Sequence, residues 1–99
     1  MAAVGFEEWK PGQFRVTGRL NFDTVAEALE KSRGVFGDHK KIELDFKQVD
    51  STDSAGLALL VEWAGWAHRE KRRMVFRHLP DQALALARIS EVDKLLPTR

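Results

Sequence analysis

The order of the predicted elements indicates a small α/β domain with a mixed sheet. Short segments that alternate polar and apolar residues are typical of half-buried strands, and amphipathic segments with a helical period lie between them. The order strand, strand, helix, strand, helix, strand, helix implies right-handed crossovers between parallel strands. We therefore predict one α/β sandwich over residues 1–99, with about four to five strands and about three to four helices.

The first part of the chain predicts a hairpin followed by a helix. Two short strands, 6–10 and 13–17, flank the turn dipeptide Pro11-Gly12, and the second strand alternates polar and apolar residues. Asp23 is typical of a helix start, and an apolar stripe continues from there to about Ser32.

The second part predicts two further strands, each followed by a helix. Residues 41–46 alternate cleanly and form the clearest strand of the sequence. The remaining predicted elements are a long helix at 55–71, a strand at 73–79 that stops before Pro80, an amphipathic helix at 81–89 and a short apolar tail at 92–96.

Composition excludes several classes of protein. A net charge of +1 produces no strong electrostatic attraction to nucleic acid or to membranes. The absence of cysteine excludes disulfides and thiolate chemistry. No signal peptide and no run of membrane-spanning length is visible. The basic segment 68–73 lies at a predicted helix end, where cations complement the helix dipole. We therefore expect a cytoplasmic protein without direct membrane insertion and without a nucleic-acid partner.

The most informative stretch is residues 49–60. A buried strand ends just before it and an apolar helix begins within it, so a hydroxyl-bearing turn is presented at a helix N-terminus. Asp53 or Ser54 is expected to cap the helix. Such a turn can cap a helix, receive a phosphate or dock against a partner.

The helix that follows has two apolar faces. Leu57, Leu60 and Ala67 share one side, which suffices to cover a sheet, whereas Leu59, Trp63 and Trp66 share the other. The second side is either covered within the domain by the hairpin or the last helix, or exposed as an aromatic anchor for another protein. We favour the exposed anchor, because a domain of this size has few elements left to cover it.

No pattern of catalytic or metal-binding residues is visible. The three histidines share no metal-ligand spacing, and neither a G-x-S-x-G elbow nor a G-x-x-x-x-G-K-[ST] loop is present. Glu43 and Asp45 alternate along a strand and are interpreted as its solvated side. We predict a protein that is not an enzyme, with no catalytic residues, no cofactor and no metal.

The segment Asp53-Ser54-Ala55-Gly56-Leu57, between an alternating strand and an apolar helix, resembles the D-S/T-x-G-L loop of STAS domains, the anti-sigma-factor-antagonist fold. In that family the hydroxyl residue, here Ser54, is the regulatory position. Gly18-x-Leu20 is similar to the family's G-x-L-D element, with Asn21 in place of the Asp. Within the family, residues 56–60 and Leu95-Leu96-Pro97 look like the cytoplasmic STAS subunit of the Mla phospholipid-transport ABC complex.

That resemblance implies a non-catalytic subunit that binds and regulates the ATPase subunit of an ABC phospholipid transporter and helps maintain outer-membrane lipid asymmetry. It would lie at the cytoplasmic face of the inner membrane through its partner. The expected partner-binding residues are Thr52, Asp53, Ser54, Ala55, Gly56, Leu59, Glu62, Trp63, Trp66 and Glu70. The alternative is an anti-sigma-factor antagonist whose Ser54 is phosphorylated by a partner serine kinase.

Overall fold

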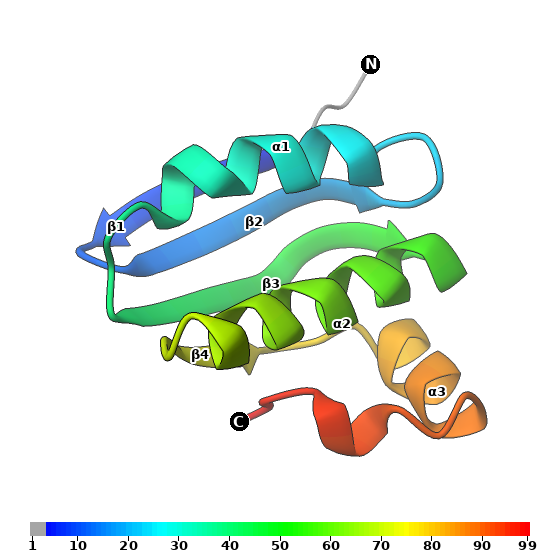
Figure 1. The fold of residues 1–99 in the computed structure, drawn as a ribbon. Helices are drawn as coiled ribbons and strands as arrows, with labels where there is room; N and C mark the ends of the chain where they lie inside the picture. Colours follow the sequence, from blue (N-terminus) through cyan, green and yellow to red (C-terminus); the bar gives the residue numbers. More distant parts are fainter. Residues whose placement is uncertain (1–3) are drawn as a thin grey trace.

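Four strands form one sheet in the order β1-β2-β3-β4 (Figure 1), as a computed structural model shows for residues 4–99. β1 and β2 are antiparallel, and β3 runs parallel to both β2 and β4. The strands are β1 (Gly5–Lys10), β2 (Gln13–Leu20), β3 (Lys41–Thr52) and β4 (Arg73–Arg77). The predicted mixed sheet is therefore confirmed, with four strands.

Three α-helices and one short 3-10 helix complete the fold. The helices are α1 (Val25–Phe36), α2 (Ser54–Arg69), α3 (Asp81–Ile89) and the 3-10 helix η1 (Asp93–Leu95). The two crossovers, through α1 and α2, step the same way across the sheet, and right-handed crossovers of this kind put both helices on one face. The indole Nε1–H of Trp63 in α2 donates to Ser32 Oγ in α1 at 2.9 Å, so the two helices are direct neighbours. α3 packs on the other flank of α2.

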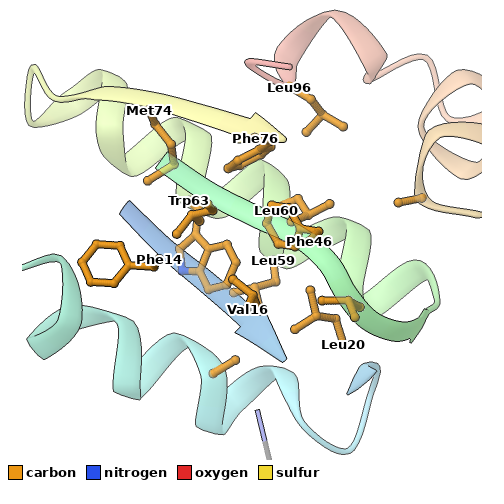
Figure 2. Packing of buried hydrophobic residues seen from close by; sticks show 14 of the residues in the cluster. Phe14, Val16, Leu20, Phe46, Leu59, Leu60, Trp63, Met74, Phe76 and Leu96 are labelled. Carbon is orange, nitrogen blue, oxygen red and sulfur yellow. The ribbon is translucent and has the colours of Figure 1, made fainter. Parts of the chain in front are cut away.

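The core lies between the sheet and the helix layer (Figure 2). Along β3, Ile42, Leu44 and Phe46 are buried, whereas Glu43 and Asp45 between them point to the opposite, helix-free face. On that open face the carboxylates are paired, Glu43 with Arg77 at 2.8 Å and Asp45 with His78 at 3.1 Å. These pairs support the interpretation of the two acids as the solvated side of the strand.

Strand β3 is twice as long as the alternating segment that predicts it, because it continues to Thr52. Two register shifts against β2, one between Arg15 and Thr17 and one between Gly18 and Arg19, absorb the irregular pattern that follows Phe46. The extension carries the chain directly into α2 and thus sets the position of the Asp53-Ser54 turn.

The two edges of the sheet differ. Among residues 4–99, β1 pairs only with β2, and its Glu7, Glu8 and Lys10 are exposed charges that discourage pairing with another chain. At the β4 edge the C-terminal segment adds a bridge, in which the Phe76 N–H donates to Pro97 O at 2.8 Å and the Arg99 N–H donates to Phe76 O at 3.0 Å. The predicted apolar tail at 92–96 therefore leads into a segment that covers this edge.

Candidate functional site

Asp53 organises the turn between β3 and α2. Its Oδ1 accepts from the Gly56 N–H at 3.0 Å, which makes Asp53, rather than Ser54, the N-cap of α2. Its Oδ2 accepts from the Phe22 N–H at 3.2 Å, in the loop between β2 and α1. One carboxylate therefore fixes two neighbouring loops relative to each other.

Ser54 is the first residue of α2 and is exposed. Because Asp53 caps the helix, the Ser54 hydroxyl is not needed for that role. Within residues 4–99 no hydrogen bond involves the Ser54 side chain, so its oxygen faces solvent at the positive end of the helix dipole. The arrangement leaves Ser54 available for contact with another molecule or for modification.

A large apolar side chain lies beside this turn. Phe22 is 81% exposed, although its backbone is held to Asp53. Exposed Ser54, Ala58 and Glu62 follow on successive turns of α2. We call the set Phe22, Ser54, Ala58 and Glu62 the Ser54 surface. Phe22 is absent from the partner-binding residues predicted from the sequence. The signal that could have identified it is a large apolar residue between Asn21 and Asp23, just before a helix start.

Two residues of the predicted partner-binding set are structural. Thr52 is 4% exposed, and its N–H donates to Gln82 Oε1 of α3 at 3.3 Å. Gly56 is buried, and a Cβ at this position would overlap Thr52 Oγ1 and the carbonyl oxygen of Leu20. The glycine of the D-S-x-G-L segment therefore permits close approach of α2 to the ends of β2 and β3, and neither residue lines the outer surface.

The expectation of an exposed aromatic face on α2 is wrong for Leu59 and Trp63. Leu59 is 4% exposed and Trp63 is 1% exposed, so both belong to the core (Figure 2). The physical reason is that α1 packs along the flank of α2, and the Trp63 indole lies against Phe36 at a centroid distance of 5.8 Å. The indole is covered by α1 and also by the hairpin, since the ring of Phe6 in β1 lies 5.9 Å from it.

Trp66 and Glu70 lie toward the far end of α2. Trp66 is half-buried, with its ring 5.5 Å from that of Phe36 and with the Arg72 guanidinium 5.1 Å from its centroid. Glu70 is exposed at the C-cap, and a helix of 16 residues separates it from Ser54 by about 24 Å. The structure thus brings together Asp53, Ser54 and half-buried Ala55, and it leaves Glu70 remote from them.

Within the part of the chain that the structure describes, no group of three His, Asp or Glu side chains is placed to hold a metal ion. No helix in residues 4–99 has both the length and the apolar character needed to span a bilayer.

Comparison with known proteins decides the family. A family model described as "Mlab, STAS domain" matches residues 7–97, which is nearly the whole chain. The chain belongs to the STAS domain family. STAS domains are typically non-catalytic regulatory domains. No curated protein matches this STAS domain.

Two solved structures share the fold of this STAS domain. The anti-sigma factor antagonist SpoIIAA in its unphosphorylated form superimposes with a TM-score of 0.71 at 15% identity, covering 98% of this chain and 88% of that one. The Bacillus cell fate determinant SpoIIAA in the phosphorylated form gives a TM-score of 0.66 at 15% identity, covering 98% and 91%. The predicted STAS-like fold is therefore confirmed.

Proposed function

We propose that this STAS domain is a non-catalytic cytoplasmic subunit of an ABC phospholipid transporter and that it binds and regulates the ATPase subunit. The description of the matching family supports this function. The observation that carries the proposed mode of binding is Phe22, an aromatic side chain 81% exposed beside the capped turn that presents Ser54. Aromatic residues held on a rigid backbone are typical anchors of protein interfaces.

The Ser54 surface suits a partner that packs closely. Ser54 and Ala58 are small, so the α2 backbone is accessible there, and Phe22 supplies apolar area at its side. The domain would then act by contacting one conformation of the ATPase more extensively than another, which shifts the population between them. Nothing in this mechanism requires the STAS domain to contact nucleotide.

The alternative is an anti-sigma-factor antagonist regulated by phosphorylation of Ser54. The exposed Ser54 hydroxyl, which the capping geometry leaves unused, favours it. A phosphate at Ser54 would benefit from the helix dipole but would meet the neighbouring charges of Asp50 and Asp53, so it would weaken docking. The two functions share one surface and differ in the partner.

An affinity capture from detergent-solubilised native membranes and the soluble fraction tests the proposal. We expect wild-type chain to recover an ABC ATPase with its permease, identified by mass spectrometry. Phe22→Ser is expected to lose this partner, because truncation of an aromatic anchor weakens an interface by about 2 kcal/mol or more. Ile89→Ser is the matched control, since Ile89 is 80% exposed on α3 and lies outside the Ser54 surface.

The outcomes separate the two functions. Recovery of a serine kinase in place of the transporter, with binding lost in Ser54→Asp and kept in Ser54→Ala, would move the assignment to the anti-sigma-factor switch. Recovery of the ABC ATPase by Phe22→Ser and wild type alike would contradict the proposed surface while leaving the transporter function in place.

A further inference from the structure

A basic hollow lies at the end of the sheet opposite Ser54. It has a volume of about 530 Å³ and is bordered by the β1–β2 turn, the first residues of β3 and β4, and the C-terminal segment. β3 begins with Lys41 and β4 begins with Arg73, and both are exposed on the helix-free side of the sheet, since each precedes a buried residue. Arg99 completes the lining from the segment that pairs with β4.

Lys41 and Arg73, the two cations that the sheet contributes to this hollow, form no ion pair within residues 4–99. Lys41 and Arg73 are register partners on adjacent parallel strands, an arrangement in which like charges repel. Within residues 4–99 no carboxylate of an Asp or Glu side chain lies within 4.0 Å of the charged nitrogens of Lys41, Arg73 or Arg99. The lining contains one acidic side chain, Glu43, and the Arg77 Nε at 2.8 Å already compensates its charge.

We propose that the basic hollow binds a small phosphate-bearing anion between Lys41 and Arg73. The planar guanidinium of Arg73 can donate two parallel hydrogen bonds to phosphate oxygens, and the Lys41 ammonium adds a point charge. An anion placed between them relieves the repulsion across the two strands. The volume of the hollow is in the range of small-molecule sites, and Pro11, Val75 and Pro97 offer apolar area for the rest of the ligand.

This site goes beyond the proposed function and is independent of it. The hollow and the Ser54 surface lie at opposite ends of β3, so an anion and a protein partner can be bound at the same time. The phosphate can belong to a soluble phosphorylated molecule or to a lipid headgroup, and the two sources are separable by experiment.

The test uses the full chain, labelled with nitrogen-15, titrated with inorganic pyrophosphate at low ionic strength and followed by NMR. We expect saturable shifts at the backbone amides of residues 12–13, 41–43 and 73–75. The double variant Lys41→Gln/Arg73→Gln is expected to bind at least about tenfold more weakly, because two charge-assisted contacts are lost. Lys47→Gln/Arg88→Gln removes the same charge from exposed positions outside the hollow and should bind as wild type.

A second arm measures cosedimentation with vesicles of phosphatidylglycerol and of phosphatidylcholine. Vesicle binding that depends on Lys41 and Arg73 supports the site and identifies a headgroup as the source, whereas pyrophosphate binding alone supports a soluble ligand. If neither probe depends on these two residues, or if pyrophosphate shifts all exposed basic positions equally, the proposal is wrong.

Discussion

Trp63→Ala is expected to lower the free energy of unfolding by about 3–5 kcal/mol, because it removes the largest fully buried side chain and leaves a cavity. The indole lies against three aromatic rings, those of Phe6, Phe36 and Phe46, at centroid distances of 5.9, 5.8 and 6.5 Å. Urea unfolding followed by circular dichroism measures the change. A variant as stable as wild type would contradict the placement of Trp63 in the core.

Ser32→Ala tests the same region if Trp63→Ala does not fold. Ser32 Oγ accepts a hydrogen bond from the Trp63 Nε1–H and donates one to the Leu29 carbonyl at 2.7 Å. The hydroxyl therefore links α1 to α2 through the Trp63 indole. Removal of the hydroxyl leaves a buried indole N–H unpaired, at a cost of about 1–3 kcal/mol. Ser90→Ala, at an exposed position after α3, is the control and should change stability little.

Gly56→Ala is expected to destabilise the domain by about 1–3 kcal/mol or more, despite the higher helix propensity of alanine. The added methyl group would overlap Thr52 Oγ1 and Leu20 O, and the second of these is backbone that cannot move aside alone. α2 would have to shift away from the ends of β2 and β3. Thermal and urea unfolding of the purified variant measure the loss.

Gly65→Ala provides the matched comparison on the same helix. A Cβ at Gly65 would meet only Arg69 Nη1, at 3.1 Å, which is the far end of a flexible side chain. We therefore expect a gain in stability of up to about 1 kcal/mol from helix propensity. Equal effects of the two substitutions would show that close packing at Gly56 is not what requires glycine there.

The sequence allows prediction of the fold because its patterns are local. Alternation in residues 41–46 and the amphipathic period of residues 81–89 correspond to β3 and α3, and α3 has the predicted bounds. The D-S-A-G-L segment likewise falls at the predicted junction of a strand and a helix. The pattern of charged and apolar residues at neighbouring positions is sufficient to predict such elements, because each pattern reflects which face of a single strand or helix is buried.

Which side chains of α2 are buried depends on the element that packs beside this helix. That neighbour is distant in the sequence, so the pattern of α2 alone does not predict it. The helical period assigns Leu59, Trp63 and Trp66 to a side of their own, but Trp63 lies against Phe6 and Phe46 of the sheet as well as against Phe36 of α1. The period therefore does not separate Trp63 from the sheet-facing side, and it cannot say that α1 covers the flank of α2. Strand order with two crossovers in one direction places α1 there. Ser32, a polar residue within the apolar stripe of α1, is the signal that could have predicted a buried hydrogen-bond partner.

The exposed surface at Ser54 also depends on contacts between distant segments. Phe22 and Asp53 are 31 positions apart, and a hydrogen bond between the Phe22 N–H and the Asp53 side chain joins them. With Trp63 in the core, the outer surface of α2 is formed by small and polar residues, and Phe22 is the large apolar side chain next to it. The proposed interface is therefore centred on the start of α2 and does not include its buried aromatic residues.

Docking through the Ser54 surface is tested most sharply by titration calorimetry. The measurement compares the affinity of wild type, Ala58→Arg and Ala85→Arg for the captured ABC ATPase. Both alanines are exposed on helices, but only Ala58 lies in the Ser54 surface. We predict that Ala58→Arg weakens binding by more than about tenfold, equivalent to about 1.4 kcal/mol, and that Ala85→Arg binds as wild type. Unchanged affinity in Ala58→Arg would contradict docking through the Ser54 surface.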